Sequence, residues 1–323
     1  MKLHILSFLA LLFSAAACQS SKSHTFTNNT IDIESTSDSL ILFEENLIST
    51  PLYERDLAIN TQGNEIIYTL GDYKQSRRAL VILRKIKEVW SGPEVMNISG
   101  VYQDIEPFFA NKGNRLFFAS NRPMDNDISR EDYNIWYSDR IEGGWSEPIA
   151  LDSIINTRGD EFFPSLSDKG NLFFTASRED GVGREDIFMS EFIDNKFTAP
   201  RPLPGEINTS KFEFNAYVSP EEHLIIFSSF GRADGLGGGD LYISRKDNSG
   251  NWTASKNLGA SINSNKLDYC PFVDWKSGNL YFTSERGVLE NKKLENIGEL
   301  KGQANSPLNG FGNIFKIGID NVE

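Results

Sequence analysis

Apolar and aromatic residues occur along this chain in short runs separated by polar, glycine-rich turns. Residues 116–119, 172–175, 224–227 and 280–283 are such runs, each rich in Phe, Ile, Leu or Tyr. Runs of this length and composition are typical of β-strands, and no segment has the 3.6-residue spacing of a sustained amphipathic helix. The pattern therefore predicts an all-β protein.

The runs belong to a repeat that occurs five times. A copy begins with an acidic residue and an apolar strand, continues through a turn, an aromatic strand and a Gly- and Asp-rich loop, and closes with a third strand and Ile-Asn followed by Thr or Ser. The first copy is degenerate. The leading acids are Glu54, Glu106, Glu161, Glu213 and Asp268. A repeat of about 40–50 residues with four short strands predicts a β-propeller blade.

The two ends of the chain supply complementary parts of one blade. The last copy stops at Ile319, after its third strand, and residues 41–43 and 47–50 form a matching apolar piece. Ser49 lies five residues before Glu54, as Asn208 lies five residues before the next leading acid. We therefore expect a five-bladed β-propeller in which an N-terminal strand closes the last blade and leaves no unpaired edge. Six blades is the alternative if one blade escapes detection.

The repeat resembles the WD40-like repeat of bacterial TolB-type propellers over residues 50–320. The similarity lies in the Lys-Gly turn at 169–170, the Leu-Phe-Phe strand after it and the Asp-Ile-Phe-x-Ser strand at 186–190. This resemblance implies a propeller, commonly with six blades in that family. It implies little about function, because propellers host many activities.

The N-terminus has the features of an export signal. Lys2 precedes the apolar run 5–13, which is too short to span a bilayer, and three Ala residues lead to Cys18. This arrangement resembles the lipobox of bacterial lipoproteins, in which the signal is removed before the Cys and the thiol carries diacylglycerol. Ala15 departs from the Leu preferred there, so ordinary signal cleavage after Ala17 is the alternative.

The residues after Cys18 bear on location. Gln19 rather than Asp follows the Cys, which by resemblance to lipoprotein sorting implies the outer membrane, and the lack of an adjacent acidic cluster favours its periplasmic face. The polar residues that come next predict a flexible tether. The chain thus divides into a signal peptide at 1–17, a tether at 18–32 and a propeller at 33–323.

The net charge bears on possible partners, and the cysteine content bears on possible disulfides. The net charge of −13 would repel nucleic acid phosphates, so no nucleic acid partner is expected. If Cys18 is acylated, Cys270 is the remaining thiol and no intramolecular disulfide can form. We expect Cys270 to be buried in an apolar strand.

The leading acids are the first candidate site. On the innermost strands, Glu54, Glu106, Glu161, Glu213 and Asp268 would ring the central channel and attract a cation or amine. The alternative is structural, with each acid accepting hydrogen bonds from the backbone or from Ser and Thr of a neighbouring blade. The Arg–loop–Asp segments at 122–132, 178–186 and 232–240 predict Arg–Asp bridges within a blade rather than calcium loops.

No catalytic motif accompanies these acids. The sequence has no Cys/His cluster and no G-x-S-x-G elbow, so we expect no metal, no cofactor and no enzymatic activity. The last copy alone carries a long insertion at 287–312. Its apolar residues are a candidate binding surface, with an ordered surface loop as the alternative: Leu289, Leu294, Ile297, Leu300 and Leu308.

These observations predict a membrane-anchored scaffold of the cell envelope. Its partner would be an envelope protein or a small ligand bound on one face of the propeller. The alternative is an exported carbohydrate-active hydrolase or lyase that uses carboxylates in the central pocket.

Acylation of Cys18 is directly testable. The protein should incorporate radiolabelled palmitate and fractionate with membranes, and Cys18→Ser should abolish the label and release the protein. Equal membrane retention of wild type and Cys18→Ser would rule out the lipid anchor.

Overall fold

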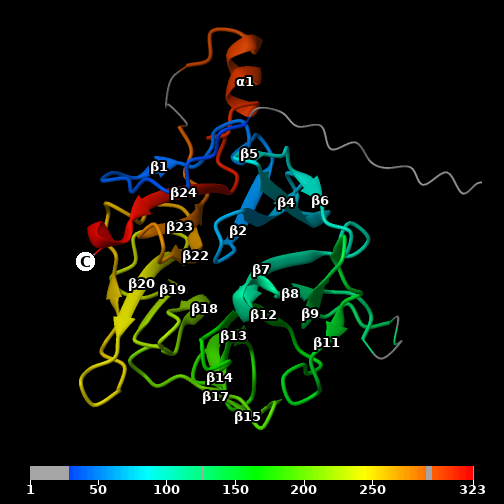
Figure 1. Cartoon of the computed structure of the whole chain (residues 1–323). Coiled ribbons are helices and arrows are strands. Elements are labelled where there is room, and N and C mark those ends of the chain that lie inside the picture. Colours follow the sequence, from blue (N-terminus) through cyan, green and yellow to red (C-terminus); the bar gives the residue numbers. More distant parts are fainter. Residues whose placement is uncertain (1–28, 125–126, 128, 289–292, 323) are drawn as a thin grey trace, which may run out of the picture.

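The computed structural model describes residues 29–124, 127, 129–288 and 293–322, and its strands form five blades around one axis (Figure 1). From the axis outward, the first two blades are β2 (Tyr53–Ile59), β3 (Glu65–Gly71), β4 (Arg78–Ile86) and β6 (Glu94–Val95), then β7 (Asp104–Ala110), β8 (Arg115–Ser120), β9 (Asn134–Ile141) and β11 (Ile149–Ala150). The third and fourth are β12 (Glu161–Leu166), β13 (Leu172–Ala176), β14 (Asp186–Ser190) and β17 (Arg201–Pro202), then β18 (Phe212–Val218), β19 (Leu224–Phe230), β20 (Asp240–Arg245) and β21 (Lys256–Asn257). The predicted all-β, five-bladed propeller is confirmed.

The fifth blade is assembled from both ends of the chain. Its strands are β22 (Asp268–Asp274), β23 (Asn279–Ser284), β24 (Asn313–Gly318) and the N-terminal β1 (Ile41–Leu42), all antiparallel. The Phe43 amide donates to the Ile314 carbonyl at 2.8 Å, the same bond that Leu151 makes to Ile135 at 3.0 Å in blade two. The predicted closure by an N-terminal strand is therefore confirmed.

The predicted tether ends earlier than residue 32. Ile31 and Ile33 are buried in the core between blades five and one, and Asn29 forms a β-bridge with Trp90. The Lys316 ammonium donates to the Asp32 carbonyl at 2.8 Å. The described part of the predicted tether, residues 29–32, therefore packs on the propeller, and its remainder lies outside the described residues.

The remaining elements are short. Hairpin strands β5 (Val89–Trp90), β10 (Gly144–Trp145), β15 (Phe192–Ile193) and β16 (Lys196–Phe197) extend the blades, and η1 (Asn111–Gly113), α1 (Ile297–Ala304) and η2 (Ile319–Val322) are the helical turns and helix. Among the described residues, no helix is long and apolar enough to cross a membrane.

Apolar side chains fill the spaces between neighbouring blades. Ile67 and Ile82 of blade one pack with Phe118 and Trp136 of blade two, and each is almost fully buried. A blade is covered on both faces, so its strands are apolar in continuous runs rather than in strict alternation. This explains the hydrophobic pattern of the sequence.

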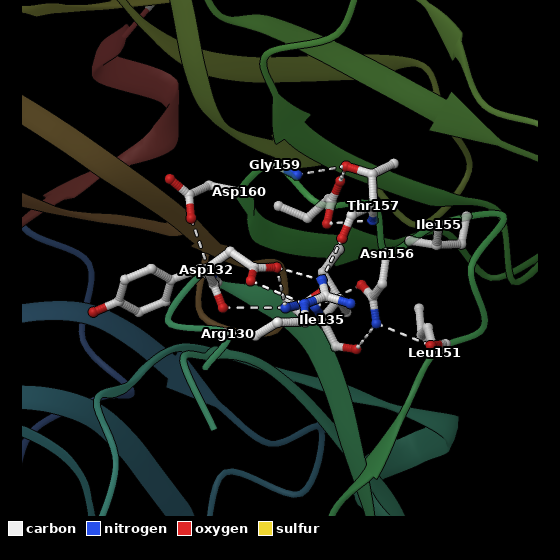
Figure 2. A network of polar contacts seen from close by, with 12 residues as sticks. Arg130, Asp132, Ile135, Leu151, Ile155, Asn156, Thr157, Gly159 and Asp160 are labelled. Carbon is white, nitrogen blue, oxygen red and sulfur yellow. Dashed lines mark hydrogen bonds and ion pairs between the residues drawn. The ribbon is translucent and has the colours of Figure 1, made fainter. Parts of the chain in front are cut away.

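The Ile-Asn-Thr segment of the repeat joins one blade to the next (Figure 2). The Asn156 side chain accepts from the Ile135 amide at 2.8 Å and donates to the carbonyls of Ile135 and Leu151 at 3.0 and 2.9 Å. Asn208 and Asn263 make the same pair of bonds to Ile187 and Leu241. One amide side chain thus holds the third strand of a blade to the connector that leads to the next blade.

Deletion of residues 19–48 should destabilise the protein. It removes β1 and the buried Phe43 and Ile48, and it exposes the edge of β24. We expect the free energy of unfolding to fall by about 3 kcal/mol or more, with aggregation through the open edge. Urea unfolding measures this, and Ile41→Ala, an exposed position in β1, is the control expected to change little. An unchanged midpoint for the deletion would refute closure.

Candidate functional site

The predicted ring of five acids is not assembled. Glu161 accepts hydrogen bonds from the Thr157 amide at 3.0 Å and hydroxyl at 2.6 Å, and Arg178 lies 3.5 Å away. Glu213 and Asp268 repeat this arrangement with Thr209 and Arg232, and with Ser264 and Arg286. Glu54 accepts from the Thr50 amide and hydroxyl, at 3.0 and 2.5 Å. Each of these four fully buried acids is tied to the connector before its own blade.

Glu106 is not the equivalent of the other four acids. In blade two their place is taken by Asp104, which accepts from Ser99 at 2.8 Å and Ser120 at 2.6 Å and pairs with Arg122 at 2.5 Å. Ser99 lies five residues before Asp104, the spacing that relates Asn208 to Glu213. That signal was present in the sequence and places the start of the repeat two residues earlier than Glu106.

The prediction that each arginine of an Arg–loop–Asp segment pairs with the aspartate of its own loop is wrong. These arginines pair instead with the acids of the first strands. Arg232 lies 3.0 Å from Glu213 and also donates to the Ile207 carbonyl of the preceding connector at 2.5 Å. Asp186 accepts backbone amides of its own glycine turn instead, from Val182 at 2.8 Å and Gly183 at 2.9 Å. The arginines therefore link each blade to the one before it.

The channel is lined by a different set of five residues. Every inner strand has a β-bulge, and the bulged residue has a φ between 50° and 61°. These residues are Asp56, Glu106, Phe163, Asn215 and Cys270. A bulge redirects the side chain of the extra residue, and here the redirected residues of different blades contact one another.

Contacts between blades fill the channel. Glu106 accepts from the Phe163 amide at 2.7 Å and from the Asn215 side-chain amide at 3.2 Å. The Cys270 thiol lies 3.5 Å from the Asn215 side-chain oxygen. Burial raises the pKa of the Cys270 thiol, so this residue is a packed thiol rather than a nucleophile.

Arg55 forms ion pairs with both channel carboxylates. Its guanidinium lies 2.8 Å from Asp56 and 2.8 Å from Glu106, and it stacks over the Tyr269 ring at 5.0 Å. The three charged side chains are at most 11% exposed. Burial raises the pKa of Glu106 to about 7, against the lowering effect of Arg55. The two carboxylates therefore share one cation, Arg55.

The bulges also explain why position 106 of the channel is occupied by a glutamate. The bulge amides of Glu106 and Asn215 donate to the hydroxyls of Thr69 and Thr175 in the preceding blades, at 3.1 and 3.0 Å. Ala119 occupies the corresponding position before Phe163, and the Glu106 carboxylate accepts the Phe163 amide instead. Glu106 thus satisfies a buried amide that would otherwise lack an acceptor.

Aromatic side chains surround this polar plug. Tyr53, Phe163 and Tyr269 are buried in one cluster, against which the partly buried Phe214 and Phe311 pack. The Tyr53 hydroxyl donates to Glu285, and Tyr269 donates to Tyr53 at 3.3 Å. Within the described residues, no group of three acidic, His or Cys side chains is arranged to hold a metal ion.

The insertion exposes apolar side chains. Ile297 and Leu300 of α1 are 72% and 50% exposed, Leu294 is also exposed, and the helix has no buried residue. Leu308 instead packs on the core of blade five, and Leu289 lies outside the described residues. The structure therefore brings together three of the five predicted apolar residues on one exposed segment, which projects beyond the ring of blades in Figure 1.

Hydrogen bonds anchor the base of the insertion to blade one. Asn309 donates to the Pro51 carbonyl at 3.0 Å, and the Glu54 amide donates to the Gly312 carbonyl at 2.8 Å. At the start of α1, Asn296 and Glu299 cap each other, with the Glu299 amide 3.1 Å from the Asn296 side-chain oxygen. The helix is thus locally stabilised although it buries nothing.

Comparison with known proteins identifies the fold alone. No protein-family profile matches the chain, and no curated protein does. A solved glycoside hydrolase is 10% identical with a TM-score of 0.52, over 90% of this chain and 92% of the other. A protein solved in an RGII complex gives 10% identity and a TM-score of 0.53, over 89% of this chain and 92% of the other.

TolB-type propellers are also among the structural neighbours. A putative TolB from Agrobacterium tumefaciens is 14% identical with a TM-score of 0.47, over 77% of this chain and 78% of the other. TolB from Acinetobacter baumannii is 12% identical with a TM-score of 0.47, and the match covers 83% of this chain but 52% of that one. The two matches with TM-scores above 0.5 are 10% identical to this chain, so they bear on its fold alone and not on its activity.

The missing arginine in blade one predicts a pH-dependent stability. Burial raises the pKa of Glu54 from 4.5 to about 7, and no arginine pairs with it among the described residues. In the unfolded chain Glu54 ionises near pH 4.5, whereas in the folded protein it stays protonated until about pH 7. The folded protein therefore loses stability as pH rises from about 4.5 through about 7, because ionisation of the buried carboxyl is costly. Glu54→Gln should therefore stabilise the protein at pH 8 by about 1 kcal/mol or more and change little near pH 4.

Glu213→Gln is the matched control for this prediction. It leaves the buried Arg232 without its carboxylate, so it should lower stability by about 3 kcal/mol or more at pH 8. Urea unfolding at the two pH values distinguishes the variants. Equal stability changes for Glu54→Gln at both pH values would contradict the assigned titration.

Proposed function

We propose that this protein is a membrane-anchored binding protein of the cell envelope, whose partner is another protein that docks on the insertion at 287–312. The anchor would be the acylated Cys18, on the periplasmic side of the outer membrane. The propeller would act as a rigid scaffold and not as an enzyme.

The exposed apolar face of α1 carries this proposal. Ile297 and Leu300 lie three residues apart on a helix, so they share one face, and neither packs on the propeller. Leu294 and Val288 are exposed on the same segment. The base of the insertion is fixed to Pro51 and Glu54, so the helix is presented from a rigid ring. An exposed apolar segment on a rigid scaffold favours association with a protein surface.

The state of the channel supports a binding function over hydrolysis. Glycoside hydrolysis uses two carboxyl groups that face the sugar from two sides. In the channel, Asp56 and Glu106 are both paired with Arg55 and almost fully buried. They are therefore engaged in holding the blades together.

One observation favours the alternative of an exported carbohydrate-active enzyme. Glu185 precedes β14 and forms a parallel β-bridge with Phe212, the first residue of the inner strand β18. Burial raises the pKa of Glu185 to about 7, and the negative charge of the nearby Asp160 adds to the rise. A carboxyl group with such a pKa is suited to general acid catalysis. This alternative requires an activity on glycans that Glu185→Gln removes.

Site-specific photocrosslinking tests the proposed docking surface. A benzoylphenylalanine at position 297 should form a discrete crosslinked species in intact cells, whereas the same residue at Ser249, in an exposed turn of blade four, should not. Leu300→Glu should weaken the crosslink, because a charge on the apolar face is costly to bury. Identical crosslinking from positions 297 and 249 would place the partner elsewhere.

A further inference from the structure

A pocket of about 530 Å³ lies where blades one and two meet. It is formed by the loop between β3 and β4 and by the connector that leads to β7. Its lining combines Arg77 and Arg78 with apolar side chains, including Leu52, Val95, Val101 and Tyr102, which are all exposed. A volume of this size suits a peptide segment or a small organic ligand.

The charge of Arg78 acts at longer range on Glu106, where it opposes the rise in pKa caused by burial, but the direct partners of Arg78 are neutral. The Arg78 side chain donates from Nε to Gln103 at 2.9 Å and from Nη2 to the Tyr133 hydroxyl, and both partners are neutral. Within the described part of the chain, neither Arg77 nor Arg78 forms an ion pair. A guanidinium has five N–H donors in a fixed plane, so most of the Arg78 donors remain available to a ligand.

Neutral contacts hold the Arg78 guanidinium in place. The Gln103 backbone amide donates to the Asn121 side-chain oxygen at 2.9 Å, and the Gln103 side chain donates to the Ser76 carbonyl at 2.6 Å. Arg78 also lies over the Tyr133 ring at 5.4 Å. The acidic residue of the pocket, Asp72, accepts the Ser76 amide at 2.7 Å within its own turn. An oriented cation of this kind favours a carboxylate, which Arg binds through two parallel hydrogen bonds.

We infer that this pocket binds an acidic, extended peptide segment of the docked partner, with Arg77 and Arg78 receiving its carboxylates and the apolar rim covering its apolar side chains. The inference rests on the proposed function and adds the chemistry of the partner. Leu52 of the pocket follows Pro51, whose carbonyl accepts a hydrogen bond from Asn309, so the pocket borders the base of the insertion. In a chain with a net charge of −13, two arginines that form no ion pair with any described residue complement an acidic peptide, and the apolar side chains beside them add to this fit.

Selection from a random peptide library tests this assignment. Phage-displayed dodecapeptides are selected on the purified full-length chain, and a synthetic fluorescein-labelled winner is then measured by fluorescence anisotropy. We expect a consensus that combines Asp or Glu with apolar residues, and an affinity that falls with added salt because the charges are near the surface. Arg77→Ala/Arg78→Gln and, separately, Val101→Asp should each weaken binding about tenfold or more.

Matched variants make the result specific. Arg158→Gln/Arg184→Gln removes two exposed arginines outside the pocket and should leave the affinity unchanged. Circular dichroism and urea unfolding verify the fold of each variant, and Val101→Asp alters a side chain that is 84% exposed. Selection without an acidic consensus, equal affinity of the Arg77/Arg78 variant, or preferential binding of labelled oligogalacturonate would overturn the peptide assignment.

A further variant separates this inference from the proposed function. Leu300→Glu, in the chain that carries benzoylphenylalanine at position 297, should weaken the crosslink but retain binding of the acidic peptide. If the acidic peptide binds but no crosslink forms from position 297 in the otherwise wild-type chain, the proposed docking on the insertion is contradicted and the peptide-binding pocket is supported. If the crosslink forms but no acidic peptide binds, the pocket fails alone.

Discussion

Five inner strands converge on one axis, and the residues they turn toward that axis must share a space closed to water. The bulge in each inner strand directs Asp56, Glu106, Phe163, Asn215 and Cys270 into this space. Two of them are carboxylates, and two buried like charges are stable together only with a compensating cation. Arg55 supplies that cation from the position next to the first bulge. Paired side chains fill this channel, and we therefore propose ligand recognition at the rim of the propeller.

The degenerate first blade has two consequences with one structural cause. In the other blades the loop between the second and third strands carries an arginine, which binds the first-strand acid and the carbonyl of the preceding connector. The loop of blade one, residues 72–77, is the shortest of the five and places no arginine on Glu54. Within the part of the chain that the structure describes, Glu54 is therefore buried without a cationic partner, and its pKa rises. The same short loop leaves the adjoining space at the junction with blade two open as the pocket of Arg77 and Arg78.

The sequence was informative where the fold depends on local repetition. Blade count, strand order and closure by residues 41–43 follow from the spacing of Ser49 and the Ile-Asn-Thr segments, and the Asn156 clamp shows why that segment recurs. The channel was not predictable in this way. A bulge leaves no mark in an apolar run, and alignment on Glu106 rather than Asp104 concealed that each channel residue lies two positions after the leading acid. The pocket lies beside an unusually short loop, which a search for shared motifs does not register.

Asymmetry is the property that connects the candidate sites. A perfectly repeated propeller offers five equivalent surfaces, and a ligand that prefers one of them needs a feature that the others lack. Here the repeat is broken in two places, by the insertion of blade five and by the short loop of blade one. Closure of the ring makes these blades neighbours, and Asn309 joins the two through the Pro51 carbonyl. The N-terminal strand that closes the fifth blade therefore does more than remove an edge, since ring closure makes the two irregular blades adjacent.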